Sequence, residues 1–433
     1  MTVVASDIQH SHKETAMNHA RAGRRQATVL AGRTISAVAG RPRVKPCRPK
    51  RRFALTALMV PLLAAGALIG LGSGAASAGT CVSWTGAQPP SAGTSGLLQG
   101  ATVVSSCSAW AAGYYDNGTA NQTLIYHWNG ASWAQQTSPD PGGTGETNEL
   151  SGVTSTSTKN AWAVGYYYDG TSDVTLIEHW NGSNWTQQPS VNPGTSVNFL
   201  EAVKATSASN AWAVGYYYNG TTYRSLIERW NGSSWKKVAS PNVGSSYNLL
   251  YSVAATSASN AWAVGYYYNG TGYSTLIEHW NGSTWKHVTS PNPAGATKEN
   301  FLRGVAVTSA GSAWAVGYTY NGINEQTMIL RWNGSTWKHV TSPNPSTSEN
   351  ILLGVKATSA SNAWAVGYYY NGSNDQALVT HWNGHSWAKV TSPDLNNSYN
   401  YLAAVGASSA TSIWAVGQYY NGSEYQGLAE HCC

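Results

Sequence analysis

The chain has 433 residues and a formal net charge of +6, which at first suggests a basic protein that binds nucleic acid or acidic membranes. Residues 1–52, however, hold twelve of the 25 Lys and Arg residues and only two acids, so the remainder has a net charge near −4. An acidic body gains nothing from counterion release on a polyanion, and we therefore expect no nucleic-acid partner.

The composition predicts an all-β protein. Trp occurs 20 times and Phe 3 times, Gly occurs 45 times, and charged residues make up 10% of the chain, against roughly 25% in an ordinary globular domain. Tryptophan, tyrosine and threonine with frequent turn residues are typical of short strands rather than of helical cores.

The N-terminal region is predicted to direct export. A basic leader, residues 1–52, precedes an apolar and small-residue segment, residues 53–78, and this order predicts a secretory signal peptide cleaved after Ala78. The apolar segment is close to the length of a membrane span, so an uncleaved N-terminal anchor is the alternative. With cleavage, residues 79–433 form a secreted protein with no membrane segment.

The cysteines agree with export. Four remain after cleavage, and an even number in an oxidising compartment predicts disulfide bonds; they are Cys81, Cys107, Cys432 and Cys433.

The exported part is built of seven repeats. A motif close to Ala-Trp-Ala-Val-Gly recurs at intervals of 50 or 52 residues, and its tryptophans are Trp110, Trp162, Trp212, Trp262, Trp314, Trp364 and Trp414. Seven units of about 51 residues account for the whole of residues 79–433. Short strands repeated at this period indicate a propeller or a solenoid.

One unit shows the expected strands. They cover residues 199–206, 211–218, 225–230 and 235–239, and the last two are joined by Asn-Gly, which predicts a tight type I′ turn with positive φ at both positions. Each unit is thus a four-stranded antiparallel meander, and the chain is predicted to be a seven-bladed β-propeller.

Side-chain alternation explains how the blades would pack. In the second strand one face carries Trp212, Val214, Tyr216 and Tyr218, and the other carries Ala211, Ala213 and Gly215. The bulky face of one blade is expected to pack against the small face of the next, so most tryptophans are predicted to be core residues.

The ring is predicted to close out of phase. The last unit stops at Cys432, before a fourth strand, and that strand is found instead near Trp84, where residues 81–84 align with residues 232–235. Three tryptophans per unit predict 21, and the missing one falls at Cys432. We expect Cys81 to bond to Cys432 or Cys433, with Cys107 taking the remaining cysteine.

The repeats resemble the bacterial neuraminidase-repeat, or Asp-box, propellers. The similarity rests on Ala-Trp-Ala-Val-Gly and on residues 276–285, Leu-Ile-Glu-His-Trp-Asn-Gly-Ser-Thr-Trp, and is strongest to the photosystem II assembly-factor branch. It implies the propeller fold. The turn Asp of the family would align with Trp280, so an ordinary Asp-box is absent, and neither the kelch nor the WD pattern recurs.

Catalysis is not expected. Sialidase-like propellers bind the substrate carboxylate with an arginine cluster, whereas four arginines remain here, Arg224, Arg229, Arg303 and Arg331, with no triad expected at the central channel. The third strand carries His or Arg in every unit, but equivalent residues on different blades lie too far apart to share a metal. We therefore assign no catalytic residue, metal site or cofactor.

One rim of the propeller is the expected binding surface. It carries the loops between second and third strands, which include Tyr218 and Tyr268, and the loops between blades, and recognition usually resides in loops on a rigid scaffold. An asparagine precedes the first strand in six units, and Asn198, Asn248 and Asn300 are candidate ligand residues among them. The alternative is that these asparagines cap strand ends.

A better indication of a ligand site is one position of the first strand at which the seven repeats no longer resemble each other. The seven units have different residues there, namely Gln99, Ser151, Glu201, Tyr251, Arg303, Leu353 and Ala403. Glu201, Tyr251 and Arg303 lie on consecutive blades and combine both charge signs with an aromatic ring, which predicts a ligand site. Drift at a solvated position is the alternative.

Three functions fit the sequence. The leading interpretation is a secreted, monomeric, non-catalytic propeller that binds glycans or a cell-surface partner through one rim. The second is an extracellular carbohydrate-active hydrolase or lyase, which requires paired acids among Glu149, Glu201, Glu299 and Glu349 at the channel mouth. The third is a structural or assembly factor, which rests on fold alone.

Overall fold

The computed structural model describes residues 81, 83–396 and 398–432. The predicted leader, residues 1–52, the predicted signal segment, residues 53–78, and Cys433 lie outside the described residues. Within the described part, no helix is long and apolar enough to cross a membrane.

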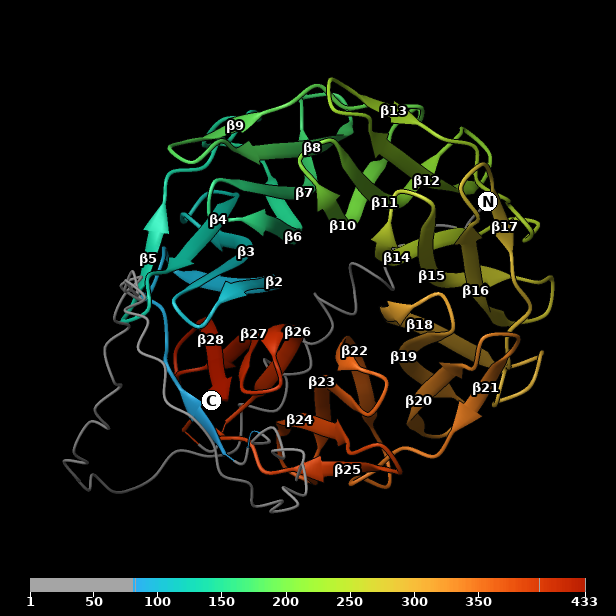
Figure 1. The fold of residues 1–433 in the computed structure, drawn as a ribbon. Coiled ribbons are helices and arrows are strands. Elements are labelled where there is room, and N and C mark those ends of the chain that lie inside the picture. The colour runs from blue at the N-terminus through green and yellow to red at the C-terminus, as the bar shows by residue number, and fades with distance from the viewer. Residues whose placement is uncertain (1–80, 82, 397, 433) are drawn as a thin grey trace, which may run out of the picture. The chain divides into compact units, whose positions relative to one another are not determined.

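The described residues form strands, turns and loops, and the 28 strands fall into seven four-stranded blades (Figure 1). Blade 1 consists of β2 (Ser95–Ser105), β3 (Ser108–Asp116), β4 (Asn121–Trp128) and β5 (Trp133–Gln136). Blade 2 consists of β6 (Asn148–Ser157), β7 (Asn160–Tyr168), β8 (Asp173–Trp180) and β9 (Trp185–Gln187). Blade 3 consists of β10 (Asn198–Ser207), β11 (Asn210–Tyr218), β12 (Tyr223–Trp230) and β13 (Trp235–Lys237).

Blades 4 to 7 repeat the same arrangement. Their strands are β14 (Asn248–Ser257), β15 (Asn260–Tyr268), β16 (Tyr273–Trp280) and β17 (Trp285–His287); β18 (Glu299–Ser309), β19 (Ser312–Tyr320), β20 (Glu325–Trp332) and β21 (Trp337–Val340); β22 (Asn350–Ser359), β23 (Asn362–Tyr370), β24 (Asp375–Trp382) and β25 (Trp387–Val390); and β26 (Asn400–Ser409), β27 (Ser412–Tyr420), β28 (Tyr425–Cys432) and β1 (Trp84–Gly86).

The blades close into a ring with their first strands innermost, as Figure 1 shows. Strands within each blade pair antiparallel, and the first strands of neighbouring blades contact one another in order, with β2 contacting both β6 and β26. One parallel contact, between Tyr273 of β16 and Glu299 of β18, additionally links blades 4 and 5. The predicted all-β, seven-bladed propeller is confirmed.

The Asn-Gly turns differ from the prediction. Gly232 has a φ of 98°, but Asn231 is not among the residues with positive φ. The Asn231 Oδ1 instead accepts hydrogen bonds from the backbone N–H groups of Ser233 and Ser234, each at 3.0 Å. The prediction of a type I′ turn was therefore wrong, because the asparagine side chain organises a longer loop in which only glycine needs positive φ.

The blades pack as the alternation predicts. Trp162 and Val164 of blade 2 share a buried cluster with Ala211 and Ala213 of blade 3. Each tryptophan of the Ala-Trp-Ala-Val-Gly motif is at most 1% exposed, and a buried indole at about 25 cal/mol/Å² stabilises the fold by roughly 4–6 kcal/mol before entropy costs. These contacts therefore hold adjacent blades together.

The glycine of the motif serves a backbone bulge. In blade 3 the pairing of β10 with β11 shifts between Leu200 and Ala202, so that Glu201 is the extra residue. A Cβ on Gly215 would lie 2.0 Å from the Phe199 carbonyl oxygen, a distance that no side chain tolerates. The same shift occurs in all seven described blades, so glycine is required wherever the first strand bulges.

Buried glutamates link neighbouring blades through the Ser-Pro segments. The Ser240 hydroxyl of the loop after blade 3 donates to both oxygens of Glu278 in blade 4, at 3.0 Å each, and Glu278 is fully buried. Burial raises the pKa of Glu278 to about 8, although the Ser240 hydrogen bond lowers it in part. Equivalent serine–glutamate pairs are Ser138–Glu178, Ser190–Glu228 and Ser392–Glu430.

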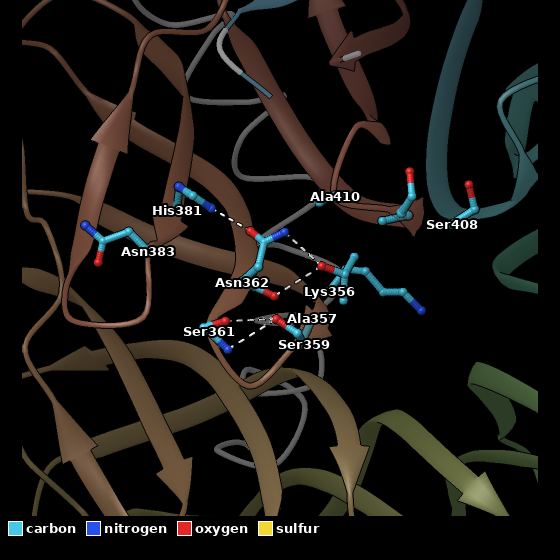
Figure 2. Close-up of a pocket in the computed structure, with 12 residues that line it drawn as sticks. Lys356, Ala357, Ser359, Ser361, Asn362, His381, Asn383, Ser408 and Ala410 are labelled. Atoms are coloured by element: carbon cyan, nitrogen blue, oxygen red, sulfur yellow. Dashed lines mark hydrogen bonds between the residues drawn. The ribbon is translucent and has the colours of Figure 1, made fainter. Parts of the chain in front are cut away.

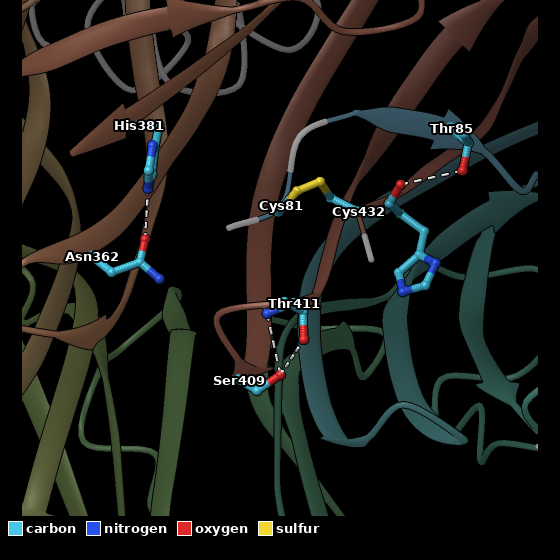
Figure 3. Close-up of a disulfide and its surroundings, with 8 residues drawn as sticks. Cys81, Thr85, Asn362, His381, Ser409, Thr411 and Cys432 are labelled. Carbon is cyan, nitrogen blue, oxygen red and sulfur yellow. Dashed lines mark hydrogen bonds between the residues drawn. A yellow bond between two sulfur atoms is a disulfide. The ribbon is translucent and has the colours of Figure 1, made fainter. Parts of the chain in front are cut away.

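The ring closes as the sequence predicts. Strand β1 pairs with β28, so that Trp84 lies opposite Cys432, and blade 7 takes its fourth strand from the N-terminal end of the described chain. A disulfide joins Cys81 to Cys432, with Cα atoms 5.7 Å apart (Figure 3). Cys107 is also disulfide-bonded, to a partner outside the described residues.

Removing the ring-closing disulfide should destabilise the propeller. The bond joins cysteines 351 residues apart, and in the chain-entropy model it restricts the unfolded chain enough to contribute roughly 3–5 kcal/mol. Cys81→Ser/Cys432→Ser is expected to lower the urea midpoint of unfolding without changing the blade structure seen by circular dichroism. An unchanged midpoint would show that the seventh blade closes without covalent help.

The buried glutamates should make stability depend on pH. An acid whose pKa is raised from its ordinary value of 4.5 to about 8 on folding contributes stability that is complete below about pH 4.5 and is lost as pH rises through about 8. The free energy of unfolding is therefore expected to fall between pH 5 and 9. Glu278→Gln should reduce this slope, whereas Glu146→Gln, at an exposed loop position, should not; equal slopes in both variants would contradict the assignment.

Candidate functional site at the channel mouth

The seven bulge residues lie on the innermost strands, at the position where the sequence loses its repeat symmetry. A bulge turns a side chain away from the regular alternation of its strand. Because the first strand lines the channel, the bulge presents this side chain near the mouth of the channel, on the rim that also carries the loops between second and third strands. Blades 3, 4 and 5 place Glu201, Tyr251 and Arg303 there.

The structure brings Tyr251 and Arg303 into direct contact. The guanidinium carbon of Arg303 lies 4.3 Å from the centre of the Tyr251 ring, a cation–π arrangement. Arg303 Nη2 also donates to the Tyr318 hydroxyl at 3.4 Å. The Tyr251 ring stacks on Tyr266 with centroids 5.4 Å apart, and the two hydroxyls lie 3.2 Å from each other.

Glu201 belongs to the same network. It is half-buried, and burial raises its pKa to about 7, against lowering contributions from the Arg303 charge and a Tyr216 hydrogen bond. The Tyr216 ring in turn lies 6.1 Å from Tyr251. The predicted trio therefore forms one electrostatically connected group, which we call the mouth cluster: Glu201, Tyr216, Tyr251, Tyr266, Arg303 and Tyr318.

A second carboxyl stands beside this cluster. Glu149 replaces the aliphatic or aromatic residue found at its position in the other blades, and its Oε1 accepts a hydrogen bond from Asn121 Nδ2 at 2.6 Å. Burial raises the pKa of Glu149, and hydrogen bonds from Asn121 and Tyr166 lower it in part. The charge of Glu149 also raises the pKa of Glu201, so the two acids lie close enough to interact.

Tyrosines extend the mouth cluster outward over blades 3 and 4. Tyr223 lies 5.9 Å from Tyr216 and stacks on Tyr247 at 5.7 Å, with ring planes 7° apart. Tyr218 and Tyr268, the two predicted loop residues, pack against this array from the second-to-third strand loops. Their hydroxyls donate to the carbonyls of Gly220 and Gly270, at 3.1 and 3.0 Å, so they fix the loops while leaving part of each ring exposed.

The asparagines that precede the first strands lie inside the loops. Asn198, Asn248 and Asn300 are at most 1% exposed. Asn198 Oδ1 accepts from the Gly194 N–H at 2.6 Å, and its Nδ2 donates to the Asp173 carbonyl at 3.1 Å. These hydrogen bonds cap the ends of the first strands, which was the alternative to a ligand-binding role for these residues. The asparagines therefore stabilise the loops of the rim, and their amides are not exposed to solvent.

The third-strand histidines and arginines pack against tryptophans. The His179 ring packs at a tilt on Trp162 with centroids 4.1 Å apart, and its Nε2 lies 2.8 Å from Asn160 Oδ1, while Arg229 lies over Trp212 at 4.9 Å. Among the described residues no group of three His, Cys, Asp or Glu side chains could hold a metal ion. Of the four arginines, Arg303 alone stands on an innermost strand.

Sequence reasoning found the bulge residues but missed their tyrosine partners. Tyr216, Tyr266 and Tyr318 are the first tyrosines after the motif glycine, and in the sequence they are indistinguishable from core residues. The signal that could have identified them is their place directly after the glycine that accommodates the bulge.

The comparisons with known proteins concern the fold. No protein-family model matches the chain, and no curated protein matches it significantly. Among solved structures, YCF48 bound to D1 peptide has a TM-score of 0.50 at 13% identity, covering 82% of this chain and 99% of that one. An ulvan lyase of family PL25 bound to -[GlcA(1-4)Rha3S]- has a TM-score of 0.51 at 10% identity, covering 79% and 94%. The chain is thus similar in fold to the assembly-factor and carbohydrate-active propellers that its repeats resemble.

Proposed function

We propose that this protein is a secreted, non-catalytic binding propeller that recognises glycans through the mouth cluster and the tyrosines of blades 3 and 4. The observation that carries the proposal is the convergence of Glu201, Tyr251 and Arg303, the three residues that break the repeat symmetry together, in one contact network. Among the seven bulge positions, the two charged residues lie two blades apart with Tyr251 between them. We infer that this part of an otherwise repeated scaffold is specialised for binding.

The chemistry of the cluster suits carbohydrate. Tyrosine faces offer apolar area to the C–H faces of sugar rings, and the hydroxyls, Glu201 and Arg303 offer hydrogen-bond donors and acceptors. Arg303 also brings a positive charge that favours acidic sugars over neutral ones. The disulfide between Cys81 and Cys432 is typical of an oxidising compartment, which supports export.

A glycan array probed with the purified protein tests this proposal. Binding is expected on acidic glycans, and Tyr251→Ala should weaken it at least about tenfold, because the ring supplies both stacking area and the support of Arg303. Thermal stability should fall only modestly, since the half-buried Tyr251 ring loses one stacking contact and one cation–π contact.

Leu353→Ala is the matched control, because Leu353 occupies the same bulge position in blade 6, outside the mouth cluster. It should leave glycan binding intact. Equal losses in both variants, or no glycan bound by the wild type, would contradict the proposal, and capture of a cell-surface protein in place of glycan would point to the other partner class.

A carbohydrate-active hydrolase or lyase is the second candidate. The interaction between Glu149 and Glu201 favours it, because cleavage of a glycosidic bond uses two carboxyls, one protonated as general acid and one ionised as base or nucleophile. The neighbouring ulvan lyase shows only that the same fold has been found in such an enzyme.

Release of reducing ends from acidic polysaccharides separates the two candidates. The binding proposal predicts no turnover by the wild type, and Glu201→Gln should change affinity alone. Turnover that Glu201→Gln and Glu149→Gln each abolish, while Glu299→Gln does not, would establish the enzyme instead.

A further inference from the structure

Two lysines occupy one level of the innermost strands, on blades that face each other across the ring. Lys204 of β10 and Lys356 of β22 stand three residues after the bulges of their strands, and each pairs with the motif tryptophan of its blade. Blades 3 and 6 are three steps apart in the ring of seven, the largest separation possible, and Figure 1 shows β10 and β22 on opposite sides of its centre. The other five blades have uncharged residues at this position, which are Thr102, Thr154, Ala254, Ala306 and Gly406.

The two lysine side chains extend toward each other. Figure 2 shows the ammonium end of Lys356 pointing away from His381 and Asn362 of its own blade. On the opposite blade, burial and in addition the positive charge of Lys356 lower the pKa of Lys204 from 10.5 to about 8. Because an electrostatic effect weakens with distance, the two ammonium groups lie near each other at the centre of the ring.

The described part of the chain supplies no counter-charge to these lysines. Neither Lys204 nor Lys356 forms an ion pair or a hydrogen bond with another residue of the ranges 81, 83–396 and 398–432. The charges that affect the pKa of Glu201 are those of Arg303 and Glu149, so the acids of the mouth cluster do not neutralise Lys204. Both lysines are half-buried, and part of each side chain is therefore open to a dissolved ion.

Packing does not require a lysine at this position. Five blades place threonine, alanine or glycine opposite the motif tryptophan, and their second strands are buried in the same way. Two like charges held together in partly buried surroundings oppose folding, and an anion between them removes this cost. The departure from the repeat therefore indicates a ligand, as it does at the mouth cluster.

We propose that Lys204 and Lys356, which we call the lysine pair, bind one doubly charged oxyanion, sulfate or phosphate, at the centre of the ring. The two ammonium groups donate charge-assisted hydrogen bonds to oxygens of the same anion from opposite sides. A dianion matches the two positive charges, whereas a monovalent ion leaves one of them uncompensated.

The oxyanion is either free in solution or an ester group of a glycan. Lys204 lies three residues beyond Glu201, about 10 Å along an extended strand, so an ester on a glycan held at the mouth cluster is within reach. The ester form rests on the proposed glycan function, and the free form does not.

Calorimetry with sodium sulfate and sodium phosphate, on the full-length protein at pH 7 and constant ionic strength, tests the lysine pair. One anion should bind per chain, and sodium nitrate, the monovalent comparison, should bind at least about tenfold more weakly. Lys204→Gln and Lys356→Gln should each weaken sulfate binding by about tenfold or more. Both variants should fold, because five blades already have an uncharged residue at this position.

Lys389→Gln is the matched control. It removes the same charge from β25, the outermost strand of blade 6, where the Lys389 ammonium lies 3.9 Å from the centre of the Tyr369 ring. Sulfate affinity should be unchanged in this variant. The basic leader is common to all the variants, so any sulfate bound there does not distinguish them.

Proton uptake gives a second readout. A bound dianion stabilises the protonated form of Lys204, whose pKa is about 8 without the anion, so sulfate binding at pH 8 should take up protons and its heat should depend on the buffer. Among the described residues at this level, Lys356 is the other titratable group, since the remaining five are threonine, alanine or glycine. Lys204→Gln should therefore reduce the uptake, and Lys389→Gln should not.

A sulfated oligosaccharide and its desulfated form distinguish the two sources of the anion. If the ligand is an ester, the sulfated form should bind more tightly than free sulfate and lose affinity in both lysine variants and in Tyr251→Ala. If the ligand is the free anion, the oligosaccharide gains nothing, and Tyr251→Ala leaves sulfate binding unchanged. Failure of the glycan proposal alone thus leaves lysine-dependent sulfate binding in place.

Three results would overturn the lysine pair. The first is no binding of sulfate, phosphate or the sulfated oligosaccharide. The second is nitrate binding as tight as sulfate binding, and the third is an equal loss of affinity in Lys389→Gln and Lys204→Gln.

Discussion

The propeller depends on one contact, the packing of a motif tryptophan on the small-residue face of the next blade, which presents two alanines at six junctions and Ile413 with Ala415 at the seventh. It is repeated at every junction, and in each case the indole is buried to within 1% of its surface. The contact sets the distance between blades, and the ring closes because seven such contacts return the chain to its start. The serine–glutamate pairs between adjacent blades act on the same interface, where a neutral carboxyl accepts a hydrogen bond without a buried charge.

The same short motif also determines where function can reside. At the bulge, a carbonyl oxygen of the first strand lies where the Cβ of any other residue would be. Only glycine at this position of the motif leaves room for it. Since all seven blades have the bulge, all seven present one side chain to the channel from a rigid strand. Variation at this position costs little stability, because the packing residues around it are unchanged, and blades 3 to 5 have diverged there into a mixed-charge aromatic group.

Most of the fold could be predicted because the signals are local and repeated. The alternation around Trp212 gives the packing faces, and the missing tryptophan at Cys432 gives both the phase of ring closure and the disulfide. The type I′ turn was mispredicted because Asn-Gly occurs in two kinds of turn. In one, both residues have positive φ; in the other, found here, the Asn231 side chain accepts hydrogen bonds from its own loop and only the glycine has positive φ.

The candidate site was predictable only in part. Loss of symmetry identified Glu201, Tyr251 and Arg303, but their contacts run between blades about 50 residues apart, and no local pattern encodes them. Asn198 was a candidate for the opposite reason: it recurs in nearly every unit, and recurrence turned out to reflect capping. In this repeat protein, the residues that repeat build the scaffold, and those that do not are the candidates for function.

We propose that the divergent bulge residues of blades 3 to 5 form the ligand site. Hydrogen–deuterium exchange on the protein with and without a bound acidic glycan tests it most directly. Added protection is expected at the starts of β10, β14 and β18 and in the loops of blades 3 and 4, with none at the equivalent segments of β22 and β26. Protection spread evenly over all seven blades, or confined to blades 6 and 7, would contradict it.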